Sequence, residues 1–137
     1  MGVKRLEDLV AFQLAVELKR GVYALVDGNS RARSDWRYRD QIFDAALGGE
    51  SNIAEGWHRH GAAEIAQFLR YALASLAETE RRLRDGVDRN YFTLSEVEPL
   101  RRTCSRTIGA TTNLWKSLQP FIKKKRPGRP QRDLPDR

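Results

Sequence analysis

The chain of 137 residues is poor in cysteine, in histidine and in long apolar runs, and each scarcity excludes a class of protein. Cys104 is the single cysteine, which excludes an internal disulfide and fits a reducing compartment. No apolar run approaches the roughly 18 residues that a membrane span requires. The first residues lack the apolar run and the small-residue cleavage site of a signal peptide. We therefore expect a cytoplasmic protein without membrane contact.

The sequence also lacks a recognisable catalytic constellation. Gly48 and Gly49 have neither the spacing nor the following Lys-Ser/Thr of a phosphate-binding loop. Glu55 and His58 match the Glu-x-x-His spacing of di-iron bundles, but such a site needs a second motif of this kind. Cys104 is expected to be a buried small hydrophobe, because nothing near it in the sequence suggests a base or an electropositive setting. We predict no catalytic residue, no cofactor and no metal.

Positive charge is in excess, and it is unevenly distributed. The net charge is +7, of which residues 121–137 carry +5 and residues 1–120 carry +2. After Ile122 the hydrophobic periodicity stops, and the composition becomes that of a disordered arm. We predict a folded body over residues 1–122 and a basic, flexible tail over residues 123–137.

Four amphipathic segments predict four helices, because apolar residues recur at helical spacing in each. The first is capped by Asp8 and ends before Gly28, and Arg31–Arg33 is expected to be a loop. Ser34 is the expected N-cap of the second helix, which ends near the loop of residues 58–61. The third helix is predicted over residues 62–87.

The fourth predicted helix begins at one of two overlapping capping boxes. Thr93 with Glu96, and Ser95 with Glu98, both match this signature. Pro99 is expected in the first turn, where a missing N–H is tolerated. No segment alternates strictly between apolar and polar residues, so no sheet is predicted. The expected fold class is all-α, an antiparallel up-down-up-down four-helix bundle with a basic C-terminal tail.

The second predicted helix has two unusual stripes. One is apolar and small, and should let a neighbouring helix approach closely; it comprises Ile42, Ala45, Gly49, Ile53 and Gly56. The other is mostly polar and comprises Gln41, Gly48, Asn52 and Glu55.

The second and third helices should form an antiparallel hairpin, which places residues of the polar stripe level with residues of the third helix. Gln41 is then level with Glu78, Asn52 with Gln67, and Glu55 with Glu64. We predict a polar seam, with Arg59, His58 or His60 supplying positive charge between the two level carboxylates. Five residues are assigned to this structural motif: Gln41, Asn52, Glu55, Gly56 and Glu78.

The tail is the strongest indication of a partner. Its candidate nucleic-acid-binding residues are Lys123, Lys124, Lys125, Arg126, Arg129 and Arg132. The Pro127–Pro130 segment resembles the AT-hook class of minor-groove arms, although Pro127 stands where that class has arginine. Several Lys/Arg contacts to phosphates give salt-dependent, largely sequence-independent binding. A solubilising terminus and a membrane-surface contact are the alternatives.

A second basic patch is possible on the body, and it also has a plainer interpretation as a solvated face neutralised by nearby carboxylates. Its arginines would be Arg81, Arg82, Arg84, Arg101, Arg102 and Arg106. The neutralising residues would be Glu78, Glu80 and Asp85.

The segments QIFDAALGGESNIAEG (residues 41–56), EIAQFL (residues 64–69) and ALASLAE (residues 72–78) resemble the 23S rRNA-intervening-sequence protein family over residues 5–120. The resemblance implies a bacterial four-helix bundle that assembles as a homopentameric ring and has no established enzymatic activity. It also implies kinship with accessory variability determinants of diversity-generating retroelements, which are basic and bind nucleic acid.

The leading hypothesis is a non-enzymatic, oligomeric nucleic-acid-binding bundle. The second is a protein-interaction scaffold of unknown partner with no nucleic-acid role, whose anchors would be Trp36, Tyr38, Trp57 and Tyr91. An enzyme is the third, and it would require a deep metal-binding pocket lined by Glu55, His58 and Glu64.

Overall fold

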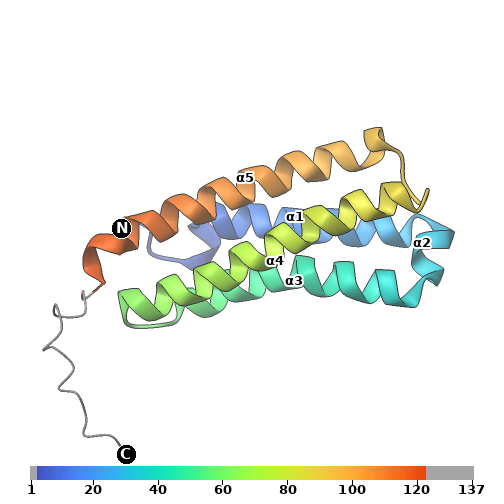
Figure 1. The fold of residues 1–137 in the computed structure, drawn as a ribbon. Helices are drawn as coiled ribbons and strands as arrows, with labels where there is room; N and C mark the ends of the chain where they lie inside the picture. The colour runs from blue at the N-terminus through green and yellow to red at the C-terminus, as the bar shows by residue number, and fades with distance from the viewer. Residues whose placement is uncertain (1–2, 123–137) are drawn as a thin grey trace, which may run out of the picture.

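The computed structural model describes residues 3–122, which form an all-α bundle without a strand in that range. The four long helices are α1 (Val10–Asp27), α3 (Trp36–Trp57), α4 (Ala62–Asp88) and α5 (Leu94–Leu118). Three short elements complete it: η1 (Leu6–Asp8), α2 (Ser30–Ser34) and η2 (Gln119–Phe121). The long helices run alternately up and down (Figure 1), so the predicted all-α four-helix bundle is confirmed.

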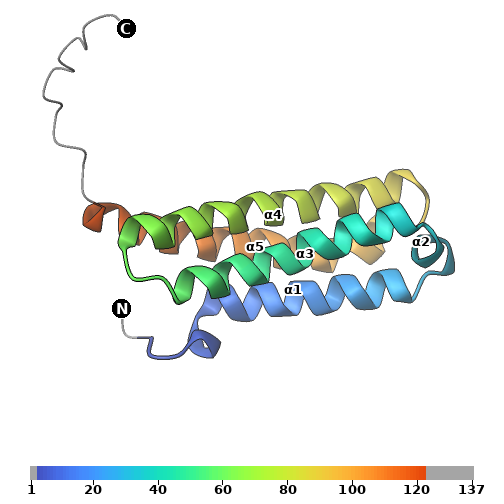
Figure 2. The same cartoon turned by 90° about the horizontal axis from the view of Figure 1, so that it is seen from below.

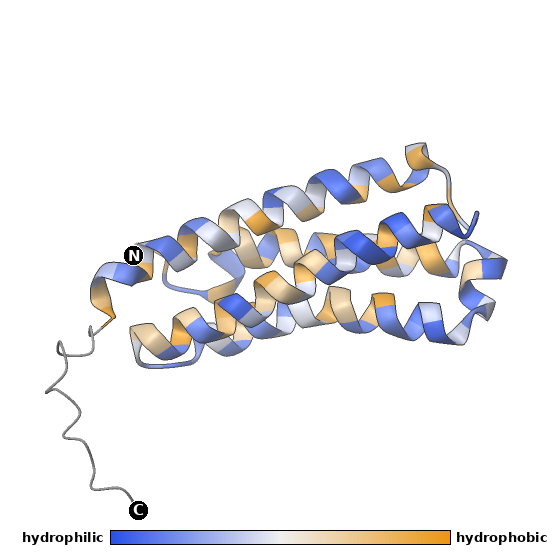
Figure 3. Ribbon diagram, in the orientation of Figure 1, coloured by the Kyte–Doolittle hydropathy of each residue, from blue (hydrophilic) through white to orange (hydrophobic). Residues whose placement is uncertain are grey.

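Each long helix packs against two neighbours. α1 contacts α3 and α5, and α4 contacts α3 and α5, so α3 and α5 lie diagonally opposite each other. The view from below shows the same four-cornered arrangement (Figure 2). Apolar and polar residues alternate around every helix (Figure 3), as expected when one face packs inward and the other meets water. None of the helices within residues 3–122 has the length and apolar character needed to cross a bilayer.

The small-residue stripe of α3 packs against α4 as predicted. All five of its members are buried: Ile42, Ala45, Gly49, Ile53 and Gly56. A Cβ atom placed on Gly49 would lie 2.8 Å from Leu76 Cδ2, and one on Gly56 would lie 3.2 Å from Phe68 Cβ. The two glycines therefore permit an approach of α4 that a larger side chain would block.

The starts of the first two long helices differ from the prediction. Asp8 lies in η1, and the residue that caps α1 is Leu9, whose side chain makes no capping bond. Ser34 does not cap α3, because it is the last residue of α2. Asp35 does so instead: its Oδ1 accepts a hydrogen bond from Tyr38 N at 3.2 Å. Asp35 takes the place of Ser34 because Ser34 belongs to α2, so that α3 begins one residue later than predicted, at Trp36.

The expected loop at Arg31–Arg33 is wrong, since these residues belong to the one-turn helix α2. Asn29 explains the difference. Its Oδ1 accepts a hydrogen bond from Ala32 N at 2.9 Å, which caps α2, and its Nδ2 donates to Tyr91 O at 2.6 Å. One side chain thus caps α2 and ties it to the α4–α5 loop, a tertiary contact that local sequence does not reveal.

The start of α5 distinguishes between the two predicted capping boxes. Thr93 is the N-cap, and its hydroxyl and the Glu96 carboxylate bond each other's backbone N–H groups. Ser95 lies within the helix, so the second box is wrong. Pro99 lies in the second turn and not the first; the Ser95 carbonyl that loses its partner is on an exposed residue, where water can satisfy it.

Candidate nucleic-acid interface

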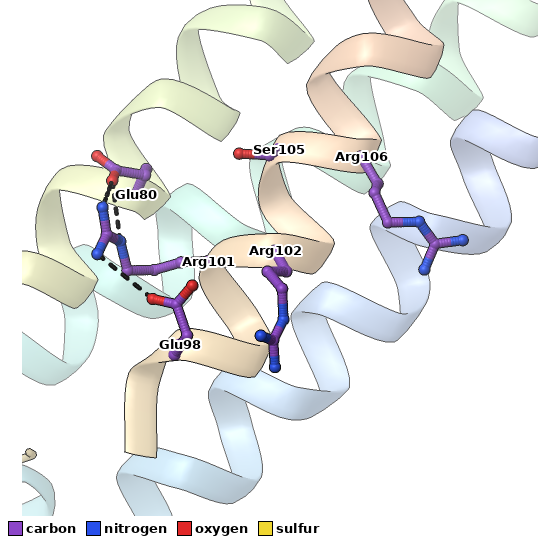
Figure 4. Close-up of a pocket in the computed structure, with 6 residues that line it drawn as sticks. All are labelled: Glu80, Glu98, Arg101, Arg102, Ser105 and Arg106. Carbon is purple, nitrogen blue, oxygen red and sulfur yellow. Dashed lines mark hydrogen bonds and ion pairs between the residues drawn. The ribbon is translucent and has the colours of Figure 1, made fainter. Parts of the chain in front are cut away.

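An open groove of about 330 Å³ runs between α4 and α5 and is lined almost entirely by charged side chains (Figure 4). Its lining comprises Glu80, Glu98, Arg101, Arg102, Ser105 and Arg106. Arg101 and Arg102 are neighbours on one turn of α5, and Arg106 lies on the next turn. The groove is thus the place where the arginines that the sequence predicted on α5 come together.

Arg101 is neutralised by two carboxylates. Its Nη2 lies 3.1 Å from Glu80 Oε1 on α4, and its Nη1 lies 3.6 Å from Glu98 Oε2, one turn earlier on α5. The contact with Glu80 joins α4 to α5 across the groove, and both contacts are drawn as dashed lines in Figure 4. Arg101 therefore contributes to the packing of the two helices, and this cluster of one guanidinium and two carboxylates adds no positive charge to the surface.

Arg102 and Arg106, unlike Arg101, are not in ion pairs within the described residues. Both are exposed, they stand four residues apart on α5, and neither has a carboxylate within ion-pair distance in the described part of the chain. In Figure 4 the Arg106 guanidinium points away from Glu80 and Glu98, whereas the Arg102 side chain extends back along α5 to the level of Glu98. Two unpaired cations on one helical face provide donors for an external anion.

The arginines of α4 mostly follow the plainer interpretation. Arg81 and Arg82 both bind Glu78, with 2.7 Å between Arg82 Nε and Glu78 Oε1. Partial burial raises the pKa of Glu78, but the hydrogen bonds from Arg82 and Arg81 outweigh it and leave that pKa below its usual value. Arg84 makes no ion pair within residues 3–122. The candidate interface therefore centres on Arg102 and Arg106 of α5.

The predicted polar seam between α3 and α4 is present in part. Gln41 and Glu78 line one shallow groove, as their level positions predict, although Glu78 binds Arg81 and Arg82 and not Gln41. Asn52 donates to Gly48 O of its own helix at 2.8 Å, not across to Gln67. The hydrogen bonds of Asn52 and Glu78 are therefore made within their own helices and not across the seam.

Arg59 supplies the positive charge at the end of the seam. Its Nη2 lies 2.5 Å from Glu55 Oε1, its Nη1 lies 3.0 Å from Glu64 Oε1, and its guanidinium sits 4.6 Å from the centre of the Phe68 ring. Of the three candidates for this role it is the one that bridges the carboxylates, while His58 stays exposed. Within residues 3–122 no group of three or more potential ligands gathers to hold a metal ion.

Cys104 is fully buried, as predicted. Its thiol donates to Leu76 O at 3.3 Å and thereby links α5 to α4. Burial raises the pKa of this thiol to about 12, with a smaller contribution from the Glu80 carboxylate. The group stays protonated near neutral pH, which suits a packing role and not nucleophilic chemistry.

The aromatic residues suggested as anchors for a protein partner are mostly not available. Tyr38 is buried, and its hydroxyl donates to Arg82 O at 2.8 Å. Tyr91 is half-buried and donates to Asp35 Oδ2 at 2.5 Å, and Trp57 packs into the core. Trp36 alone of the four is well exposed, at 75%. Position near a helix end thus did not predict exposure, because Tyr38 and Tyr91 pack against each other and Trp57 packs against a core cluster.

The six tail residues predicted to bind nucleic acid, Lys123, Lys124, Lys125, Arg126, Arg129 and Arg132, lie outside the described residues and remain a prediction. A sequence signal connects them to α5. From residue 99 to residue 132 the chain has ten Lys/Arg residues and no Asp or Glu. The absence of acidic residues from this run is the sequence signal that distinguishes the arginines of α5 from Arg81, Arg82 and Arg84 of α4, which have Asp and Glu residues as neighbours in the sequence.

Comparison with known proteins gives a family and a fold. The family model described as 23S rRNA-intervening sequence protein matches residues 7–113. No curated protein matches the chain. A solved structure of a protein of unknown function from the S23 ribosomal protein family of Bacteroides thetaiotaomicron is similar, with a TM-score of 0.73 at 19% identity. The match covers 78% of this chain and 99% of that chain.

Proposed function

The chain belongs to the 23S rRNA-intervening sequence protein family, and from that premise we propose that it is a non-enzymatic, oligomeric bundle protein that binds nucleic acid. The contacts would be made by the basic face of α5 and by the C-terminal tail. The family is one of unknown function, so the proposal depends on charge and geometry and not on a relative's activity.

The observation that carries this proposal is the separation of charge along the chain. Within residues 3–122 Arg81 and Arg82 of α4 are paired with Glu78, and Arg101 of α5 with Glu80, whereas Arg102 and Arg106 are unpaired. The acid-free run of residues 99–132 then continues the same excess of positive charge into the tail. Such a run favours a polyanionic partner, and phosphate neutralisation supplies most of non-specific affinity for nucleic acid.

Assembly would strengthen the interaction. The family resemblance implies a homopentameric ring, in which several tails would engage one nucleic acid molecule together. Linked contacts of this kind raise the overall affinity without any new contact, provided that the geometry permits simultaneous binding. The mass of the particle in solution, measured by light scattering, tests the assembly separately from binding.

The test of function compares the full chain with a variant that ends at Ile122. Binding to duplex DNA and to RNA is measured at about 50 mM and about 200 mM salt. We expect the full chain to bind at the lower salt, to weaken steeply at the higher, and to lose most of its affinity without residues 123–137. The proposal fails if the full chain binds neither nucleic acid, or binds anionic lipid vesicles more tightly than both.

A protein-interaction scaffold is the second candidate, and the exposure of Trp36 is the observation that favours it. A large exposed aromatic ring is a frequent anchor of protein interfaces. A partner protein that stays bound after nuclease treatment, and is lost in Trp36→Ala, would support the scaffold over the nucleic-acid proposal.

A further inference from the structure

We infer that the outward face of α5 binds the phosphate backbone of a double-helical nucleic acid, with Arg102 and Arg106 on successive phosphates. The inference rests on the proposed function and deepens it, because it assigns a contact surface and a form of nucleic acid to a helix of the folded body. It does not depend on where the tail lies.

The first argument is the composition of this face. After Glu98, α5 contains no acidic residue. Its exposed outward residues, referred to below as the α5 row, are Arg102, Ser105, Arg106, Gly109, Asn113 and Lys116. Arginine, lysine, serine and asparagine are among the side chains that most often bind phosphate and sugar oxygens. Ser105 and Asn113 have no side-chain hydrogen bond to another described residue, so their polar groups are available as well.

The second argument is spacing. Arg102 and Arg106 are one helical turn apart, which corresponds to a rise of about 6 Å, and the row from Arg102 to Lys116 extends over about 21 Å. The shorter distance is close to that between neighbouring phosphates of one strand. A straight helix of this length can therefore lie along a strand of a duplex and place both guanidinium groups on adjacent phosphates.

The third argument is the shape of the α5 row at its centre. A Cβ atom placed on Gly109 would meet nothing within 4 Å, so packing among residues 3–122 does not require glycine at this position. A glycine in the middle of a helix costs up to about 1 kcal/mol relative to alanine. Its absence of a side chain leaves a low point between Arg106 and Asn113, where a sugar-phosphate backbone can come close to the helix.

A duplex is preferred over a single strand because the α5 row contains no aromatic side chain. Proteins that bind single strands usually offer aromatic rings on which the bases stack. In the described chain the well-exposed aromatic side chains are Trp36, Tyr71 and Phe121, and none belongs to α5. A row of cations and small polar groups without rings is suited to a backbone whose bases are already stacked within a double helix.

Two carboxylates limit the charge of this face: Glu98, which lies one turn before Arg102 and is paired with Arg101, and Glu17 of α1. Glu17 precedes Gly21 by four residues, and Gly21 is the residue of α1 against which Leu100 of α5 packs. Glu17 therefore lies on the side of α1 that adjoins α5. It is exposed and makes no ion pair within residues 3–122. Removal of the negative charge of Glu17 should tighten binding of nucleic acid, so Glu17→Gln should change the affinity in the direction opposite to the arginine variants.

The experiment uses the full chain with Arg102→Gln, Arg106→Gln and the double variant. Arg37→Gln is the matched control, because Arg37 is also exposed, has no ion pair within residues 3–122, and lies on α3, diagonally opposite α5. Affinities for a duplex and for its separated single strand are measured over about 50 to 200 mM salt. The double variant should lower the slope of log affinity against log salt by about 2 for the duplex, since each phosphate contact contributes about 0.9.

The expected pattern is weaker duplex binding by about 3-fold or more for each arginine variant at the lower salt, little change for Arg37→Gln and tighter binding for Glu17→Gln. The inference is overturned if the full chain binds nucleic acid but the double variant matches Arg37→Gln in affinity and slope. Equal or tighter binding of the single strand overturns the assignment to a duplex. Absence of all binding by the full chain is a different result, which refutes the proposed function itself.

Discussion

Gly86 and Gly109 are both interior residues of long helices, yet their surroundings differ completely. A Cβ atom on Gly86 would lie 2.4 Å from the Tyr38 hydroxyl and 2.7 Å from Phe92 Cδ2, both of which are buried. A Cβ atom on Gly109 would meet nothing. The same residue type thus fills a steric requirement at one position and leaves an open surface at the other.

Alanine at these two positions should therefore change stability in opposite directions. Gly86→Ala is expected to lower the free energy of unfolding by about 1 to 3 kcal/mol, because it overpacks the core beneath Tyr38. Gly109→Ala is expected to raise it by about 0.5 to 1 kcal/mol, because alanine favours the helix and loses less entropy on folding. Urea denaturation measures both, and a Gly86→Ala protein as stable as the parent would contradict the packing at this site.

The buried thiol of Cys104 gives a prediction about alkaline pH. Its pKa is raised to about 12 in the folded protein from the ordinary value of 9.0, so between these values the unfolded chain releases a proton that the folded chain retains. The stability that the neutral thiol provides is complete below pH 9.0 and is lost as the pH rises toward 12. The expected loss is about 1 kcal/mol for each pH unit in this window.

Cys104→Ala is the control for this effect. Denaturation of parent and variant between about pH 8 and about pH 11 should give a steeper decline for the parent, after the constant cost of the lost side chain is subtracted. Buried Tyr38, whose pKa burial also raises, keeps its own contribution in both proteins. Parallel curves would show that the thiol titrates alike in the folded and unfolded chains.

At the scale of the helices, periodicity was a sound guide to number, type and order, because burial of one face decides where an amphipathic helix packs. The ends were less predictable. Asn29 caps α2 while bonding the distant Tyr91 carbonyl, and Asp35 replaced Ser34 as the cap of α3 because α2 exists. These choices depend on contacts between loops that are remote in sequence.

The start of α5 allows its cap to be tested with an internal control. Thr93→Ala removes the hydroxyl that accepts from Glu96 N, and it should lower the free energy of unfolding by about 1 kcal/mol. Ser95→Ala alters the other serine/threonine position that matched the capping pattern, but Ser95 is exposed within the helix, so the change should be near zero or slightly stabilising. Equal losses in the two variants would refute the assignment of Thr93 as the N-cap.

At the scale of the whole molecule, the sequence revealed the excess of charge but not its arrangement on the body. Helical spacing brought Arg81, Arg82 and Arg101 into one list with Arg102 and Arg106. The structure separates them, because carboxylates on α4 and in the first turns of α5 bind the first three. Which cation has a partner depends on helix-to-helix register, and register follows from packing of the core.

Two regions of positive charge then predict two separable contributions to binding. Residues 123–137 hold seven Lys/Arg residues, against two unpaired arginines on the α5 row. Removal of the tail should lower the salt slope about three times as much as the Arg102→Gln/Arg106→Gln variant does. Titrations of all three proteins with one duplex measure this ratio. A tail-free protein that retains the full slope would place the binding charge in the folded body alone.

The α5 row has a further consequence that concerns acidity. Its cations are two guanidinium groups and one ammonium group, and the row contains no histidine, the side chain that most often acts as a switch near neutral pH. His58 and His60 lie in the α3–α4 connection and not on α5. Attraction of phosphates to this helix should therefore not be governed by a histidine switch.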